Sequence, residues 1–191
     1  MNRQPEPRLF VAVPLPNLVK HQLAKWITSK KSEWKFSKWV YEQDLHLTLH
    51  FLGITTDQQM KEIIPALQEI VKKQNSFTLE LDELGTFGRT EQPRILWAGV
   101  RGELHQLNLL QKEVVTALSS IGFPAEDRPY RPHVTLARKY QQDHFPIAQL
   151  NQDYLGELSD RKWTVQEIVL YETKLGQKPM YHVVSSFPFS T

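Results

Sequence analysis

The 191-residue sequence contains no cysteine, which excludes disulfide frameworks, thiolate zinc sites and cysteine nucleophiles. It also lacks a long apolar run. The best run, residues 9–13, is followed by Pro14 and Pro16, whereas a membrane-spanning helix needs about 20 apolar residues. Residues 1–5 lead into this run without the longer apolar region and cleavage site of a signal peptide. We therefore expect a cytoplasmic protein with no membrane partner.

A large excess of charge of one sign is absent as well. Lys and Arg number 23 against 21 Asp and Glu, a formal net charge of +2, which argues against a cationic coat that binds long nucleic acids. Any phosphate chemistry would therefore need a local site. Hydrophobic residues make up 40% of the chain, enough to bury a core. The length fits one domain, so we expect a single domain over residues 1–191 that acts as a monomer.

The order of elements favours an α+β fold, because strands and helices mix without the regular alternation of a doubly wound sheet. Alternating or β-rich runs predict strands at residues 8–13, 46–51, 77–81, 95–100, 133–137, 165–171 and 181–187, the last two forming a hairpin around Gly176. Apolar residues at helical spacing, Leu18 among them, predict helices at 15–31 and 104–121. Residues 34–39 show no clear period, and we expect a loop there.

A third helix is predicted to begin after Thr56, which forms a capping-box pattern with Gln59, and to run to Val71. Pro65 lies inside its apolar stripe, which predicts a kink or an early break. The chain also shows a weak internal duplication, since each half contains a helix and a His-x-Thr-Leu strand. This repetition predicts two pseudo-symmetric lobes.

The repeated strand motif is the main candidate for chemistry. It reads His-Leu-Thr-Leu from His46 and His-Val-Thr-Leu from His133. Side chains at i and i+2 of a strand share one face, so each motif presents an imidazole beside a hydroxyl, that of Thr48 or Thr135. If the two strands are neighbours around a pseudo-two-fold axis, the imidazoles face a shared cleft. Two copies, one in each half, are much harder to obtain by chance than one.

Such a pair suits cleavage of a phosphodiester without a metal. A neutral imidazole can take a proton from the attacking oxygen while an imidazolium gives one to the leaving oxygen, and a reference pKa of about 6.5 allows both states near neutrality. The threonine hydroxyls can donate to non-bridging phosphate oxygens. His50 continues the face of His46, so a metal pair is an alternative, but no nearby residue supplies an obvious third ligand.

These motifs resemble those of the two-histidine (2H) phosphoesterases, and within them the LigT-like RNA 2′,3′-cyclic phosphodiesterases, historically called 2′-5′ RNA ligases. The resemblance is carried by residues 8–14, 46–53, 87–88 with 94–97, and 131–138. It implies a bilobal α+β fold in which two antiparallel sheets line a central cleft, with the helices outside. It also implies a metal-independent hydrolase without a cofactor, acting on RNA ends or oligonucleotides that carry a 2′,3′-cyclic phosphate.

The resemblance further implies a role for each motif residue. His46 would be the proton donor that protonates the departing 3′ oxygen. His133 would be the proton acceptor that activates water, leaving a 2′-phosphate. Thr48 and Thr135 would hold phosphate oxygens. The sequence symmetry alone does not say which histidine is the acid and which is the base.

Candidate substrate-binding residues surround the second motif. Residues 128–139 contain no acidic residue and four cations, Arg128, Arg131, Arg138 and Lys139. Arginines around such a strand are candidate anion ligands, and Arg131 and Arg138 are the two we select. Arg138 follows His133 by five positions, so it lies on the opposite strand face unless the strand bends. Tyr130 is a candidate for contacting the substrate, and one aromatic residue could stack on a base at the cleft, either Tyr130 or one of Phe87, Trp97 and Trp39.

Three other functions stay open from the sequence. Ligation is the same reaction in reverse, with an RNA hydroxyl in place of water, and hydrolysis should dominate unless a second RNA end is held in place. The chain could instead be a non-catalytic RNA- or nucleotide-binding module that kept the cleft. It could also be a metal-dependent phosphoesterase, in which case a chelator would abolish its activity.

Overall fold

The computed structural model describes residues 6–153, 155 and 158–190, so that residues 1–5 and four others of the expected 1–191 domain lie outside the described residues. No helix in this part is long and apolar enough to cross a membrane. The elements run in the order β1 (Arg8–Pro14), α1 (Asn17–Lys30), β2 (Phe36–Trp39), the 3-10 helix η1 (Glu42–Asp44), β3 (His46–Ile54), α2 (Asp57–Val71), β4 (Phe77–Gly88), β5 (Pro93–Gly102), α3 (Leu104–Ser119), β6 (His133–Tyr140), α4 (Ile147–Gln152), β7 (Lys162–Val165), β8 (Glu167–Thr173) and β9 (Tyr181–Pro188).

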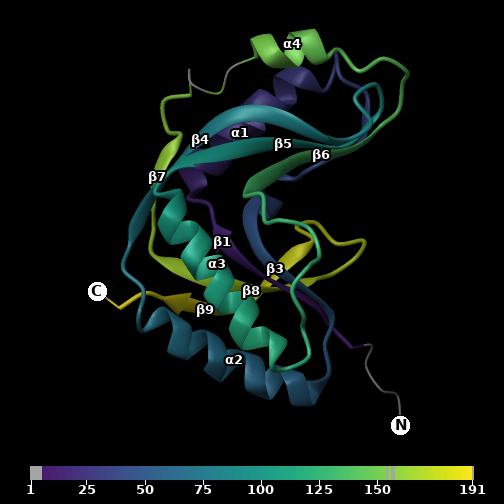
Figure 1. The fold of residues 1–191 in the computed structure, drawn as a ribbon. Coiled ribbons are helices and arrows are strands. Elements are labelled where there is room, and N and C mark those ends of the chain that lie inside the picture. Colours follow the sequence, from purple (N-terminus) through teal and green to yellow (C-terminus); the bar gives the residue numbers. More distant parts are fainter. Residues whose placement is uncertain (1–5, 154, 156–157, 191) are drawn as a thin grey trace.

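The strands form one curled antiparallel sheet in the order β7-β4-β5-β6-β3-β1-β8-β9, with β2 paired to β6 (Figure 1). β3 and β6 lie next to each other at the centre of this order. Among the described residues, the ladder between them consists of the single pair Leu47–Val134. The expected α+β fold is confirmed, but the two expected antiparallel sheets are halves of one continuous sheet, which this pair of residues joins.

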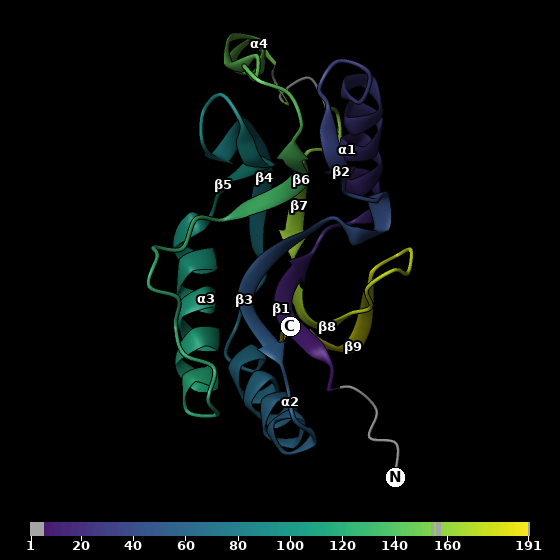
Figure 2. The same ribbon diagram turned by 90° about the vertical axis from the view of Figure 1, so that its right-hand side faces the viewer.

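The helices cover the two halves separately. α2 and α3 lie side by side against the half that contains β3 and β9, whereas α1 lies along the half with β4, β5 and β6 (Figures 1 and 2). The main core lies between these helices and the sheet and includes Val11 of β1. Phe10 and Ala12 alternate with Val11 and pack with Val169 and Tyr171 in a second, small cluster. This cluster therefore lies on the sheet face opposite the main core.

Residues 36–39 form strand β2 instead of the expected loop. β2 pairs with β6 through Phe36–Tyr140 and Lys38–Arg138, and the rings of Phe36 and Tyr140 pack edge to face at 5.2 Å. Four residues are too few for a strand period to show in the sequence. Pairing with a strand a hundred residues later decides the conformation here.

Three smaller expectations also differ from the structure. Of the kink or early break expected at Pro65, the break does not occur: α2 continues through it, because Pro65 is exposed and water can bond the carbonyl that loses its partner. Leu18 is 65% exposed, since it lies about 100° around the helix from the buried Val19. The strand expected at 165–171 is two strands, which separate at Gln166 because β7 pairs with β4 and β8 with β1 on opposite halves.

Gly85 lets the indole of Trp97 lie across the neighbouring strand. The two residues are paired in the β4–β5 ladder, and a Cβ on residue 85 would come within 2.2 Å of the Trp97 ring. The Trp97 ring lies 5.2 Å from that of Phe87 and 6.3 Å from that of His133. The glycine therefore positions an aromatic wall beside one of the motif histidines.

We predict that Gly85→Ala destabilises the protein, because the added methyl group overlaps the Trp97 ring. The expected loss in the free energy of unfolding, measured by urea denaturation, is about 1–3 kcal/mol. The double variant Gly85→Ala with Trp97→Phe is the control, since the smaller ring leaves room for the methyl group. If the stability losses of the two single variants simply add in the double variant, Trp97→Phe does not relieve the overlap, and this account of the wall is wrong.

Candidate active site

The pair Leu47–Val134 places both histidine motifs at the junction of the two halves. Both side chains are fully buried, so the residues on either side of them in each strand point to the opposite face. Those residues are all half-buried: His46, Thr48, His133 and Thr135. Neighbours of an antiparallel pair lie across from each other. The structure therefore brings the two imidazoles and two hydroxyls together on one face of the sheet.

β3 contains a one-residue bulge at Leu49. In the ladder between β1 and β3, Ala12 pairs with Thr48 and the adjacent Val11 pairs with His50, so Leu49 has no partner. The bulge turns His50 to the core face, where it is 4% exposed and its Nε2 lies 3.1 Å from the carbonyl oxygen of Phe123. The expectation that His50 continues the face of His46 is therefore wrong.

β6 contains the same kind of bulge at Leu136. Past it, Arg138 pairs with Ile95, whereas His133 pairs with Gly99. Positions 95 and 99 of β5 share a face, so Arg138 returns to the face of His133. This bulge is the bend without which Arg138 would face away. The Arg138 guanidinium accordingly lowers the pKa of both motif histidines, as a secondary contribution.

The two bulges bring equivalent positions into the site. Phe51 follows His46 by five residues, as Arg138 follows His133, and Phe51 is 56% exposed. The Phe10 ring lies between them, 4.8 Å from the ring of His46 and 5.9 Å from that of Phe51. Strand periodicity alone would place Phe51 on the core face, so sequence reasoning missed it. One half of the site thus carries a cation where the other carries an aromatic ring.

Both imidazoles are held through Nδ1 by the backbone two residues earlier. His46 Nδ1 lies 2.7 Å from the carbonyl oxygen of Asp44, and His133 Nδ1 lies 2.7 Å from that of Arg131. A carbonyl oxygen only accepts hydrogen bonds, so Nδ1 carries the proton in each ring. Nε2 is consequently the nitrogen that can exchange a proton with a substrate.

His46 is enclosed by aromatic rings. Tyr181 packs edge-on against it at 5.0 Å, and Phe10 covers it at 4.8 Å. This burial lowers the pKa of His46 from 6.5 to about 4; the hydrogen bond to Asp44 opposes the shift and the charge of Arg138 adds to it. In the free protein, His46 is therefore neutral near pH 7.

Thr48 hydrogen-bonds to Nε2 of His46, the nitrogen that must gain a proton. Its hydroxyl oxygen lies 3.0 Å from Nε2 and donates to it while the ring is neutral. An anion bound beside His46 favours the imidazolium form. Nε2 then becomes a donor, and the Thr48 hydroxyl is released to donate to the anion. Anion binding and protonation of His46 are coupled through this contact.

His133 has more open surroundings. A pocket of about 330 Å³ lies beside it, with Phe87 and Trp97 in its wall, and the Phe87 ring packs edge-on against the imidazole at 4.9 Å. Burial lowers the pKa of His133, while its hydrogen bond to the Arg131 carbonyl opposes the shift. Within the described ranges, no residue hydrogen-bonds its Nε2. The lone pair of this nitrogen is available to a water molecule.

Asp44 links His46 to the hairpin between β8 and β9. Its carboxylate is buried and accepts hydrogen bonds from the backbone N–H groups of Met180 and Tyr181, each at 2.9 Å. Its own carbonyl oxygen holds His46 Nδ1. One residue therefore fixes both the imidazole and the tyrosine that covers it. No sequence pattern pointed to Asp44, because its partners lie more than a hundred residues later.

Arg131 and Tyr130 both lie at the site. The Arg131 side chain is exposed and lines the pocket beside His133. Tyr130 also lines this pocket, and it donates its hydroxyl to the carbonyl oxygen of Thr48 at 3.0 Å. Burial raises the pKa of Tyr130, which keeps the hydroxyl protonated as a donor. Tyr130 thus ties the segment before β6 to β3.

The part of the chain that the structure describes holds no group of three or more His, Asp or Glu side chains that could share a metal ion. The histidines outside the motifs have other partners or lie at the surface. His21 lies 3.4 Å from a carboxylate oxygen of Glu42, and His182 lies 3.1 Å from the carbonyl oxygen of Pro179. His105 is exposed on α3.

Comparison with known proteins finds relatives over nearly the whole chain. The family model described as the 2′-5′ RNA ligase superfamily matches residues 19–177. An RNA 2′,3′-cyclic phosphodiesterase of Geobacillus stearothermophilus is 37% identical over 181 residues, covering 94% of this chain but only 56% of that protein. One of Bacillus subtilis is 31% identical over 187 residues, covering 96% of this chain and 97% of that protein. The chain thus spans just over half of the first relative and nearly all of the second.

Solved structures share the fold. Escherichia coli LigT, crystallised with 3′-AMP, matches with a TM-score of 0.80 at 24% identity, covering 98% of this chain and 100% of that one. A protein of Thermus thermophilus matches with a TM-score of 0.78 at 25% identity, covering 95% of this chain and 97% of that one. The sheet order and the two halves described above are therefore those of a LigT-like fold.

We predict that the His46 imidazole titrates near pH 4 in the free protein, because its enclosure by Phe10 and Tyr181 disfavours the charged ring. Inorganic phosphate should raise this midpoint, since an anion favours the imidazolium. NMR titration of the ring protons measures both values, and His46→Gln assigns the signal. A midpoint at or above 6.5 in the free protein, or one that phosphate does not move, would contradict the coupling described above.

We predict that Asp44→Ala loosens the cover over His46, because the N–H groups of Met180 and Tyr181 lose their acceptor. The free energy of unfolding should fall by about 1–3 kcal/mol, and the NOE between the His46 and Tyr181 rings should weaken. Asp44→Asn keeps one oxygen and should recover part of both. Asp127→Ala, at an exposed site, is the control and should change stability by less than about 0.5 kcal/mol. An unchanged NOE in Asp44→Ala would refute this role.

Proposed function

The chain belongs to the 2′-5′ RNA ligase superfamily, and on that premise we propose that it hydrolyses RNA 2′,3′-cyclic phosphate ends to 2′-phosphomonoesters. The observation that carries the proposal is the pair of Nδ1-anchored imidazoles, His46 and His133, on one face at the junction of the halves. Relatives named RNA 2′,3′-cyclic phosphodiesterase support this choice of substrate.

In the proposed reaction, a water molecule attacks phosphorus in line with the bond to the 3′ oxygen. His133 Nε2 takes a proton from the water as the new P–O bond forms. His46 Nε2–H gives its proton to the 3′ oxygen as the P–O3′ bond breaks. The product carries a 2′-phosphate and a free 3′-hydroxyl, and proton exchange with solvent returns both rings to their starting forms. Each proton transfer contributes about 10²–10⁴ in rate.

The surroundings of the two rings support this division of roles. The open pocket beside His133 gives its Nε2 access to water, as a general base for hydrolysis requires. His46 is covered by Phe10 and Tyr181, which keep solvent away from the proton meant for the leaving oxygen. The negative charge of the bound phosphate raises the pKa of His46 towards neutrality and so loads the acid.

The other polar groups would stabilise the charge that develops on phosphorus. The Thr48 and Thr135 hydroxyls donate to non-bridging oxygens, as P–O bonds are exchanged. Arg138, on the same face, supplies a positive charge to these oxygens. Arg131 and Tyr130 contact the substrate from the pocket beside His133.

Hydrolysis is favoured over ligation by the charge of the pocket beside His133. Its lining has two carboxylates, Asp82 and Glu83, against one cation, Arg131, and this excess of negative charge disfavours entry of a second RNA strand, whereas water needs no binding site of this size. We further propose that residues 1–191 act as one bilobal domain and a monomer in the cytoplasm, on RNA ends, without a metal or cofactor.

We predict that His46→Ala and His133→Ala each lower kcat on a 2′,3′-cyclic phosphate oligonucleotide by at least about 10²–10⁴, because each removes one proton transfer. Circular dichroism should show that both variants stay folded. His105→Ala, at an exposed site outside the junction, should retain full activity. The wild-type rate should fall at low pH as His133 is protonated and at high pH as His46 loses its proton. Undiminished activity of either motif variant would sink the proposal.

A further inference from the structure

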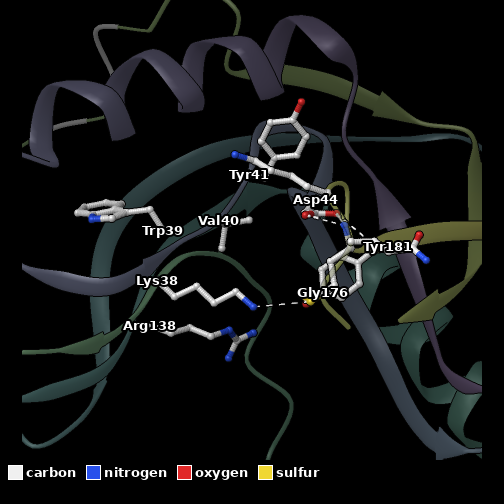
Figure 3. Close-up of a pocket in the computed structure, with 11 residues that line it drawn as sticks. Lys38, Trp39, Val40, Tyr41, Asp44, Arg138, Gly176 and Tyr181 are labelled. Atoms are coloured by element: carbon white, nitrogen blue, oxygen red, sulfur yellow. Dashed lines mark hydrogen bonds between the residues drawn. The ribbon is translucent and has the colours of Figure 1, made fainter. Parts of the chain in front are cut away.

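We infer that the groove beside His46, here called the Lys38 groove, binds a backbone phosphodiester upstream of the cyclic phosphate, so that the preferred substrate is an oligonucleotide end and not a cyclic mononucleotide. The Lys38 groove is lined by β2, by Arg138 of β6, by Asp44 and by the β8–β9 hairpin, and it encloses about 330 Å³ (Figure 3). The inference rests on the proposed function, because it needs the cyclic phosphate at His46 and His133.

The Lys38 groove carries an unpaired positive charge. Lys38 and Arg138 are directly opposite each other in the β2–β6 ladder and extend side by side into the groove in Figure 3. Like charges at opposite positions destabilise a strand pair. Among the described residues, no carboxylate forms an ion pair with either. A backbone phosphate bound by Lys38, next to the reacting phosphate that Arg138 contacts in the proposed reaction, would remove this repulsion.

Asp44, the carboxylate in the wall of the Lys38 groove, does not form an ion pair with Lys38 or Arg138. The Asp44 carboxylate is 6% exposed and turned to the N–H groups of Met180 and Tyr181, as the dashed lines in Figure 3 show. A third cation, Lys178, also lines the groove and lies over the ring of Tyr41, 4.7 Å from its centroid. The groove therefore offers three cationic side chains to a ligand.

The walls of the Lys38 groove are held in place by the same contacts that position His46. Asp44 fixes the hairpin at Met180 and Tyr181, and Lys38 Nζ lies 3.6 Å from the sulfur of Met180. Because the Asp44 carbonyl also holds His46, the groove and the proposed acid share one anchor. A phosphate in the groove would thus have a fixed position relative to the reacting centre.

In-line displacement determines which pocket holds the RNA. The attacking water and the leaving 3′ oxygen lie on opposite sides of phosphorus, so the ribose that keeps the 3′ oxygen lies on the His46 side. The chain continues from this ribose through its 5′ oxygen to the next phosphate. The groove on the His46 side is lined by three cations and one carboxylate, that of Asp44, whereas the pocket beside His133 is lined by two carboxylates and one cation, Arg131. A nucleoside 2′,3′-cyclic phosphate with a free 5′-hydroxyl lacks the group that the Lys38 groove would bind.

The test compares 2′,3′-cyclic AMP with the dinucleotide ApA bearing a terminal 2′,3′-cyclic phosphate. We expect kcat/KM to be at least tenfold higher for the dinucleotide in the wild type. Lys38→Ala should lower kcat/KM for the dinucleotide five- to tenfold more than for the mononucleotide, chiefly through KM, and Lys178→Ala should act in the same direction. For the dinucleotide, the slope of log kcat/KM against log salt concentration should be less negative by about 0.7 in Lys38→Ala than in the wild type, because one phosphate contact is removed. Lys35→Ala, exposed and outside the groove, is the matched control and should change neither substrate.

Equal kcat/KM for the two substrates in the wild type, or an equal loss for both in Lys38→Ala, would overturn the inference and leave the proposed function intact. Absence of turnover on either substrate would instead contradict the proposed function. In that case calorimetric binding of the 2′-phosphorylated dinucleotide and of 2′-AMP decides the inference. Tighter binding of the dinucleotide that Lys38→Ala abolishes supports the Lys38 groove, and equal binding refutes it.

Discussion

One backbone pairing holds the two halves of the sheet together where the chemistry is proposed. Leu47 and Val134 are opposite each other and fully buried, so the polar residues on either side of them must face the other way. Two strands from different halves thereby place an imidazole and a hydroxyl each on a common face. No loop is needed to bring the two imidazoles together, because strand alternation and one register pair place them on the same face.

The bulges at Leu49 and Leu136 then make the two halves of the site different. Each bulge shifts the strand period by one, which removes His50 from the site and brings in Phe51 and Arg138. In addition, Phe10 and Tyr181 enclose His46, while the half around His133 stays open to a pocket. A symmetric pair of motifs can serve as acid and base because its surroundings are no longer symmetric.

Periodicity and repetition were sufficient to predict the two histidine strands and the capped helix at Thr56, because these depend on neighbours close in sequence. Bulges leave no reliable sequence signal, so the same periodicity placed His50 wrongly. β2 and the contacts of Asp44 depend on segments about a hundred residues or more away. Local patterns could therefore locate the imidazoles and single out Arg138, but they could not place Arg138 on the same face or find the side chains that cover and orient the imidazoles.

The positions of the two imidazoles determine which P–O bond breaks in the proposed reaction, with His46 as the donor to the 3′ oxygen. The most direct measurement is ³¹P NMR of the product formed from a defined oligonucleotide 2′,3′-cyclic phosphate in the presence of EDTA. The predicted result is a terminal 2′-phosphate alone, at the same rate as without the chelator. A 3′-phosphate, a mixture of the two isomers, or loss of turnover with EDTA would contradict the account.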